Sequence, residues 1–390
     1  MKDNKAAGID DIRSEQIKHF GPKTLSWILT LMNNCITSMQ MPKSWRKARV
    51  VPLLKPGKNP AEPKNFRPIS LLCHLFKALE RMILKRISSF VDAALIKEQA
   101  GFRLGKSCCG QILNLTQHIE DGFERGQITG VAFLDLTAAY DTVNHKLLSQ
   151  KVCAFHLKNR QANRKLKVAW QGQELQHCST PKYLGVRLDR SLTYEKQCQD
   201  TKKKVFTQNN ILRKLTGSTW GAQPHVLRTS GLALSFSAAE YAAPVWRNLT
   251  HAKQVDVVIN ETARIISGCL KPTPIDKVYP LIGVAPPTIR REVAAEIEKM
   301  KQATDPRQPL YEHPSQPRRL KSRKSFMATT AEIKVPPTER RLELWKQQVP
   351  NPMVEPREEG TTGFQLPFAT WKCLNRLRTD VTRCKANLAK

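Results

Sequence analysis

Apolar residues recur at helical spacing in three stretches of the first part of the chain. The first stretch predicts a helix over 25–39 that ends before Pro42, because proline cannot continue a helix. The second predicts a long amphipathic helix from about residue 70 to 90, and the third a helix over roughly 111–123. The apolar face of the long helix is expected to lie in a core and consists of Leu72, Leu75, Phe76, Leu79, Met82, Ile83 and Phe90.

Short apolar runs between these helices predict strands. The runs are RVVPLL at 49–54 and VAFLDL at 131–136, and the turn-rich segment KPGKNPAEPKN follows the first of them. Because strands alternate with helices in this order, we predict a mixed α/β domain over 1–152.

The pattern changes after about residue 150. A hairpin is predicted around Gln171 and Gly172, and a further strand at 183–188 (YLGVRL). Helical periodicity from 192 to about 300, broken by glycines and prolines, predicts a helical domain over 153–303. Residues 304–390 are predicted as a Pro-rich linker over 304–326, one helix over 338–348 and a basic, partly disordered tail.

The charge of the chain narrows the choice of partner. Lysine and arginine number 64 against 33 acidic residues, which gives a net charge of +31. A field this positive indicates a polyanionic partner, most economically nucleic acid. No membrane partner is expected, because the most apolar stretch, at 231–246, is shorter than a membrane span and contains Glu240.

The ten cysteines are scattered, with no CxxC pair and no zinc-ligand spacing. They are expected to be reduced, and most of them buried. The N-terminal segment MKDNKAAGIDD has no apolar signal core. We therefore expect an intracellular, reducing compartment, with nucleus and cytoplasm not distinguished.

Asp135 is the most informative residue for chemistry because it lies inside the apolar run at 131–136. An unpaired carboxylate in such a place is costly, and a divalent cation is its usual partner. A phosphoryl-transfer site with two metal ions needs at least one more carboxylate. The only Asp-Asp pair, Asp10-Asp11, lies far upstream.

Eight collinear segments resemble the reverse transcriptase of LINE-type non-LTR retrotransposons, most closely the jockey-like group. The segments are NKAAGIDDI (4–12), PKSWRKARVVPLLKPGK (42–58), NFRPISLL with KALERMILKRI (65–87), QAGFRLGKS (99–107), FLDLTAAYDTVNH (133–145), PKYLGVRLD (181–189), EYAAPVW (240–246) and LNRLRTDVTRCKANLAK (374–390).

The resemblance implies roles for particular residues. Asp135 would be a catalytic ligand of Mg²⁺, and Tyr140 would pack beside the incoming sugar and favour dNTPs over ribonucleotides. Lys55 and Arg67 would neutralise the triphosphate. Four further residues would lie near the template strand: Gln99, Gly101, Phe102 and Arg103. The implied partners are an RNA template, a DNA primer and, in an active enzyme, a dNTP; the oligomeric state stays open.

The implied fold is a partial right-hand polymerase of mixed α+β class. Residues 1–152 would form the fingers and an incomplete palm, 153–303 a mainly helical thumb-like domain, and 304–390 the basic C-terminal region. Each of these residues could instead have a purely structural role. Asp135 would then be satisfied by backbone N–H groups, and Tyr140 would be core filler. Lys55 and Arg67 would be solvated surface charge.

The sequence also departs from the family pattern. It lacks the Pro-Gln-Gly loop and the aromatic-x-Asp-Asp hairpin that follow the first palm strand, and only 48 positions separate Asp135 from Tyr183. We therefore expect an internal deletion with its junction near 150–153, a Mg²⁺ site that does not assemble, and no polymerase activity. No endonuclease domain or Cys/His knuckle is expected at the ends.

Three functions remain as hypotheses at this stage. The chain is an RNA-directed DNA polymerase by descent but disabled, a nucleic-acid-binding module without chemistry, or the product of a genomic relic with no selected role.

Overall fold

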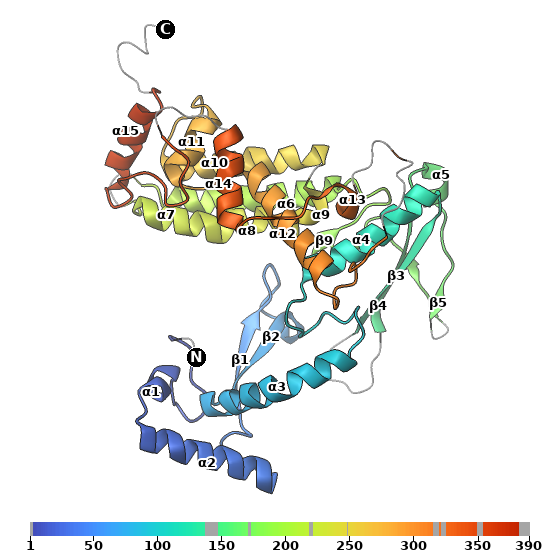
Figure 1. The fold of residues 1–390 in the computed structure, drawn as a ribbon, viewed down its shortest axis with the longest axis vertical. Helices are drawn as coiled ribbons and strands as arrows, with labels where there is room; N and C mark the ends of the chain where they lie inside the picture. The colour runs from blue at the N-terminus through green and yellow to red at the C-terminus, as the bar shows by residue number, and fades with distance from the viewer. Residues whose placement is uncertain are drawn as a thin grey trace. The chain divides into compact units, whose positions relative to one another are not determined.

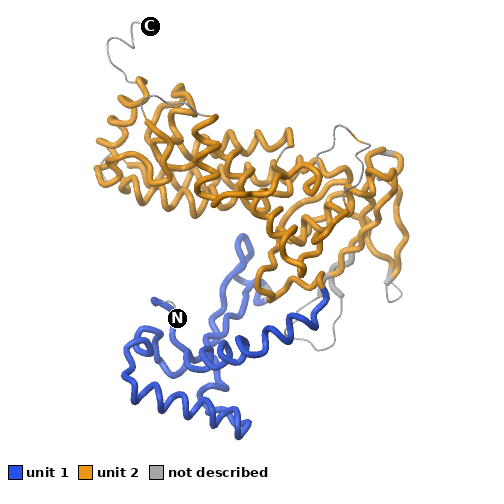
Figure 2. The backbone as a smooth tube through the Cα atoms, in the orientation of Figure 1, with its two compact units in different colours: residues 1–96 blue, residues 97–390 orange. Residues whose placement is uncertain are grey.

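The computed structural model describes residues 3–136, 147–170, 173–217, 221–247, 249–314, 320, 325–348 and 354–381 (Figure 1). The chain forms two compact units, residues 1–96 and 97–390, which are described separately (Figure 2). The predicted mixed α/β class is confirmed. The units divide at 96/97. The predicted domains 1–152, 153–303 and 304–390 and their assignment as fingers and palm, thumb and C-terminal region stay predictions.

The first unit consists of helices and one hairpin. Its elements are α1 (Ser14–Lys18), α2 (Pro22–Ser38), β1 (Arg49–Leu54), the 3₁₀ turn η1 (Pro63–Asn65), β2 (Phe66–Leu71) and α3 (His74–Ala94). Helix α2 starts with a proline, whose fixed φ suits the first helical position, and ends at Met39 in the left-handed conformation.

The core of this unit lies between α2 and α3. Ile28 and Met32 are buried with Leu75 and Leu79. The expectation that the whole apolar face of the long helix is core is wrong for its C-terminal half, because Phe90 is 79% exposed. Helix α2 covers only the first turns of α3.

Strand β2 was not predicted. It pairs antiparallel with β1, from Arg49 opposite Leu71 to Leu54 opposite Phe66. The apolar residues at 69–72 suggested the start of a helix. The backbone of residues 69–71 pairs with β1 instead, and α3 begins at His74 rather than Ser70.

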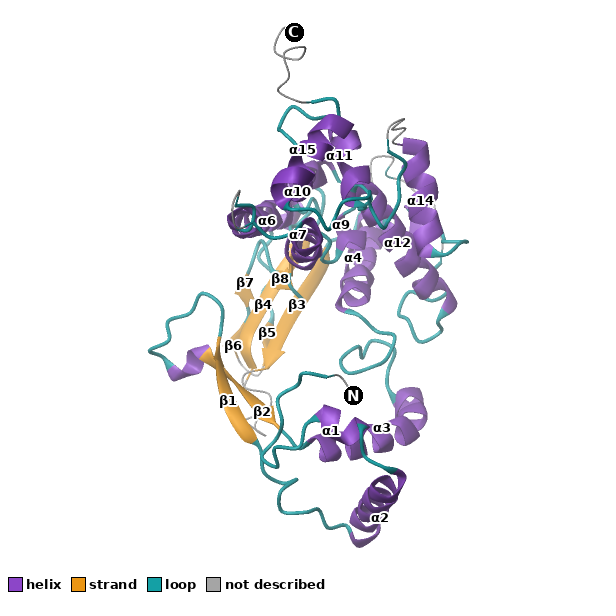
Figure 3. Ribbon diagram, turned by 90° about the vertical axis from the view of Figure 1, so that its left-hand side faces the viewer, coloured by secondary structure: helices purple, strands orange, loops and turns teal. Residues whose placement is uncertain are grey.

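The second unit contains small sheets covered by helices (Figure 3). Its first elements are α4 (Cys108–Arg125), β3 (Thr129–Leu136), β4 (Leu147–Phe155), α5 (Asn159–Ala162), β5 (Ala169–Trp170), β6 (Gln173–Glu174), β7 (Gln176–His177), β8 (Lys182–Tyr183) and β9 (Val186–Arg187). Strand order in the main sheet is β3-β4-β7, with β3 and β4 antiparallel and β4 and β7 parallel. The predicted hairpin near 171 is present as β5–β6.

Helices make up the remainder of this unit. They are α6 (Glu195–Lys214), α7 (Pro224–Gly231), the π-helical turn η2 (Leu232–Phe236), α8 (Ser237–Ala239), α9 (Ala243–Trp246), η3 (Thr250–Ala252), α10 (Lys253–Ser267), α11 (Ile275–Ile282), α12 (Pro287–Thr304), α13 (Phe326–Thr329), α14 (Pro337–Gln348) and α15 (Phe368–Arg378). One hydrophobic cluster joins the sheet to α4, α6, α8 to α12 and α14, and the buried hydrophobic residues of α7, α13 and α15 lie in two smaller clusters.

Helix α4 positions the main sheet. Ile112, Ile119 and Phe123 of α4 are buried in the same cluster as Cys153 and Phe155 of β4. Helix α4 therefore packs against the β4 strand of this sheet.

The segment YLGVRLD forms a tight hairpin rather than the single strand that was predicted. Its turn residues Leu184 and Gly185 both have positive φ, 43° and 89°, and join β8 to β9. Such a two-residue turn matches the twist of antiparallel strands. The Tyr241 hydroxyl of the EYAAPVW segment donates to the Leu184 carbonyl at 2.6 Å, so these two motifs bind each other.

Several of the charged residues are structural. Arg291 is buried and forms two hydrogen bonds to Asp256, and Arg290 forms two to Glu240 of EYAAPVW. Asp189 accepts hydrogen bonds from the backbone of the loop that leads into α6. Part of the basic excess is therefore used inside the fold.

The cysteines behave largely as expected. The nine that lie in the described residues are free, and five of them are buried. Burial raises the pKa of Cys153 to about 12, which keeps the thiol protonated and unreactive. Across the described ranges, the helices are too short or too polar to span a bilayer.

Candidate nucleic-acid interface

Asp135 lies near the end of β3, opposite Ser149 of β4, and the register shifts between it and Leu136. Its side chain lies outside what the structure describes. The neighbouring strands are LLSQKVCAF and QH, which contain no aspartate or glutamate. Asp135 is therefore the only acidic residue on the three strands of this described sheet.

Whether the chain holds a Mg²⁺ centre stays a prediction, because the Asp135 side chain and residues 137–146 lie outside the described residues. Nowhere in the described ranges do three or more His, Cys, Asp or Glu side chains gather so that they could hold a metal ion. Hard divalent cations require several oxygen ligands, and one strand position supplies at most one carboxylate. Tyr140 and Asp141 lie outside the described residues, so the predicted role of Tyr140 stays a prediction.

Lys55 and Arg67 lie together on the β1–β2 hairpin of the first unit. The Lys55 N–H donates to the Asn65 carbonyl at 2.8 Å, which extends the ladder by one residue, and Arg67 pairs opposite Leu53. Positions two apart share a face of a strand, so these two cationic residues belong to one face of the hairpin. This grouping agrees with the predicted phosphate-binding role but does not test it.

The four predicted template residues lie in one turn at the start of the second unit. The Arg103 guanidinium donates to the Gln99 carbonyl at 3.1 Å, and the Gln99 amide donates to the Gly101 carbonyl at 3.4 Å. Phe102 has a positive φ of 61° and is 100% exposed, and Leu104 is 90% exposed. An aromatic ring presented beside an arginine suits contact with unpaired bases.

The base of this turn is anchored by the segment after α12. The Lys106 ammonium donates to the Arg307 carbonyl, and the Gln308 amide donates to the Gly105 carbonyl at 3.1 Å. Hydrogen bonds from Arg307 lower the pKa of Asp305 to about 2, so this carboxylate stays ionised and holds the segment in place. Residues 305–308, which were predicted as linker, thus position the exposed turn.

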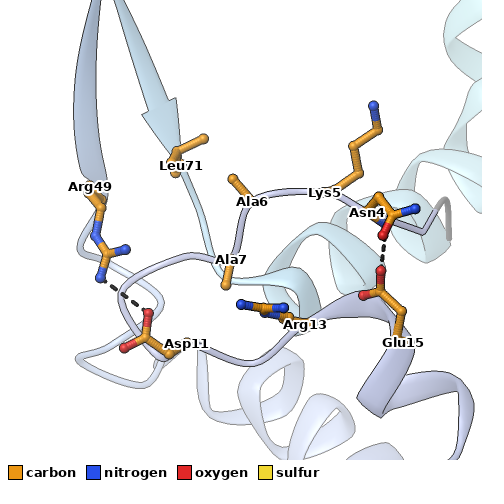
Figure 4. A pocket seen from close by; sticks show the side chains of 9 residues that line it. All are labelled: Asn4, Lys5, Ala6, Ala7, Asp11, Arg13, Glu15, Arg49 and Leu71. Carbon is orange, nitrogen blue, oxygen red and sulfur yellow. Dashed lines mark hydrogen bonds and ion pairs between the residues drawn. The ribbon is translucent and has the colours of Figure 1, made fainter.

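A pocket of the first unit was missed by the sequence reasoning. The loop formed by NKAAGIDDI bounds an open pocket of about 580 Å³, together with Arg13, Glu15, Arg49 and Leu71 (Figure 4). Asp11 pairs with Arg49 at 3.2 Å, and Glu15 accepts from the Asn4 backbone, which lowers the pKa of Glu15. Asp11, one residue of the single Asp-Asp pair in the sequence, thus forms an ion pair with Arg49.

The position of this loop depends on Gly8. A Cβ at Gly8 would lie 2.6 Å from the Cys73 nitrogen at the start of α3, so only glycine permits this approach. The sequence offered one sign of this loop: Gly8 lies in a segment that shows neither helical nor strand periodicity.

Comparison with known proteins finds a family similarity for part of the chain. Residues 53–188 match the family described as reverse transcriptase (RNA-dependent DNA polymerase). This range contains the last two residues of β1, all of β2, the exposed turn at 99–103 and the β3-β4-β7 sheet.

The curated relatives are polymerases of jockey-like and other non-LTR retrotransposons, so the predicted resemblance is confirmed. A probable RNA-directed DNA polymerase from transposon BS of Drosophila melanogaster is 33% identical over 150 residues, 38% of this chain and 17% of the relative. The RNA-directed DNA polymerase from mobile element jockey of Drosophila funebris is 33% identical over 176 residues, 45% of this chain and 19% of the relative. The chain thus spans less than a fifth of the length of these relatives.

Proposed function

We propose that this chain is a reverse-transcriptase derivative that binds an RNA template and DNA primer but does not synthesise DNA. The observation that carries the proposal is the composition of the sheet around Asp135. The strand hydrogen-bonded to β3 contains no carboxylate, whereas a two-metal site needs acidic residues from adjacent strands.

The energetic consequence follows from the charges. Two Mg²⁺ ions about 4 Å apart repel each other strongly, and several anionic ligands must offset that repulsion. One aspartate cannot do so in near-octahedral geometry. Activation of the primer 3′-hydroxyl and stabilisation of the leaving pyrophosphate would both be lost.

An internal deletion accounts for this arrangement. The proposed junction at 150–153 falls inside β4, the strand that pairs with β3 along most of its length. In this account, β4 takes the place beside β3 that the Asp-Asp hairpin has in an intact palm. The remaining sheet would still pack against α4, because Cys153 and Phe155, which lie in the same buried cluster as α4, are apolar.

Binding without chemistry is supported by the basic and exposed residues that remain. Lys55 and Arg67 lie on one face of their hairpin, and Phe102 projects from its turn. With a net charge of +31, affinity for nucleic acid should fall steeply with salt, as bound counterions are released. Affinity independent of salt, or none at about 50 mM salt, would argue against this part of the proposal.

Metal binding tests the catalytic part. We expect titration of the full chain with Mn²⁺, followed by electron paramagnetic resonance, to find only weak binding that is the same in wild type and Asp135→Asn. A tight site that disappears in Asp135→Asn would show that a second ligand joins Asp135 and would overturn the proposal.

A further inference from the structure

Helix α6 carries an exposed stripe that contributes to no core. Positions 199, 202, 203, 206 and 207 follow the spacing i, i+3, i+4, i+7 and i+8, so they share one face of the helix. The opposite face, which includes Val205 and Leu212, is buried against neighbouring helices, among them α10.

The stripe and α10 bound a groove of about 520 Å³. Its lining consists of Gln199, Lys202, Lys203, Phe206, Thr207 and Gln254. Phe206 is 53% exposed, so its ring is accessible from the groove.

The charges around the groove are of two kinds. Two charged residues of α6 outside the groove lining are paired: Asp200 with Arg187, and Arg213 with Glu261 at 3.0 Å. Lys202 and Lys203 are exposed, and their ammonium groups form no hydrogen bond or ion pair within the described residues. The groove therefore has a positive wall beside an accessible ring.

We propose that this groove binds single-stranded nucleic acid, with a base stacked on Phe206 and the flanking phosphates on Lys202 and Lys203. This inference rests on the proposed nucleic-acid-binding function and assigns a second site to it. Stacking on an aromatic side chain next to cationic residues is the way proteins hold unpaired strands without sequence preference. A duplex offers no free base face, and an acidic peptide has no use for the ring.

The experiment measures fluorescence anisotropy of labelled 12-nucleotide RNA and DNA strands with the full chain. We expect Phe206→Leu to weaken binding by roughly 5- to 100-fold, and Phe206→Trp to retain it. Lys202→Gln should make the salt dependence of the affinity shallower, by about 0.7 in slope for each phosphate that the lysine neutralises. Lys204→Gln is the matched control, because Lys204 is equally exposed but lies outside the groove lining.

The outcomes separate this site from the general function. If wild type binds strands and the groove variants bind equally well, the groove is not the site, although the proposed function stands. If wild type binds no nucleic acid, both proposals fail. Equal competition by polyglutamate, or by duplex of the same length, would also overturn the assignment to single strands.

Discussion

At the scale of single residues, Gly185 shows why part of the family-like sequence serves the fold. Its φ of 89° belongs to the region that favours glycine, and an added Cβ would lie 3.1 Å from the Tyr241 ring. The sequence alone indicated a single strand at 183–188 (YLGVRL). A turn that depends on a partner more than 50 positions away has no local signature.

We predict that Gly185→Ala lowers the free energy of unfolding by about 1–3 kcal/mol, from backbone strain and crowding against Tyr241. Urea denaturation followed by circular dichroism measures the change. Gly101→Ala is the control, because its Cβ would meet only the Gln99 amide at 3.5 Å. Equal stability of the two variants would contradict the description of the turn.

Asp305 gives a prediction about pH. Hydrogen bonds from Arg307 lower its pKa to about 2, below the ordinary 3.8. A carboxylate with a depressed pKa in the folded state contributes stability above pH 4 and loses it as the pH falls towards 2. Wild type should therefore exceed Asp305→Asn in unfolding free energy at pH 5, with the difference closing near pH 2. A difference that does not change over this range would refute the role assigned to Asp305.

At the scale of elements, hydrophobic periodicity predicted the helices and the strand that can be recognised from their own residues. Helix α2, strand β1 and helix α14 were expected at 25–39, 49–54 and 338–348, and occur close to these bounds. Strands β2 and β4 were missed because their assignment depends on pairing, which a single sequence does not reveal.

Helix α15 was also missed, and its role lies in its contacts with α10. Trp371 donates to the Ile266 carbonyl at 3.1 Å, and Asn375 donates to the Ser267 carbonyl at 2.9 Å. Arg376 donates to the Gly268 carbonyl at 3.1 Å. The last carbonyls of a helix lack partners within it, so α15 satisfies the C-terminal end of α10.

We predict that Asn375→Ala lowers the free energy of unfolding by about 1–3 kcal/mol, because it leaves a buried carbonyl without a donor. Leu377→Ala on the same helix is the control, since Leu377 is 62% exposed and should be replaceable at little cost. Thermal and urea denaturation of both variants measure the difference. If Leu377→Ala is the more damaging change, α15 is held in another way.

At the scale of the whole molecule, charge and motif order indicated a polymerase-like, nucleic-acid-binding chain, and the comparisons agree on the family of residues 53–188. The sequence placed Asp135 on a strand, and the structure adds that the adjacent strand carries no acidic residue. The groove beside Phe206 was missed. Lys202, Lys203 and Phe206 look like an ordinary solvated helix face until the position of α10 is known.

The central claim is binding without synthesis, and one measurement tests it directly. The full chain is first bound to labelled oligo(dT) on poly(A), with anisotropy confirming the complex, and dTTP is then added with Mg²⁺ or Mn²⁺. We expect the bound primer to keep its original length, because Asp135 has no carboxylate on the neighbouring strand. Metal-dependent extension that Asp135→Asn abolishes would contradict the account.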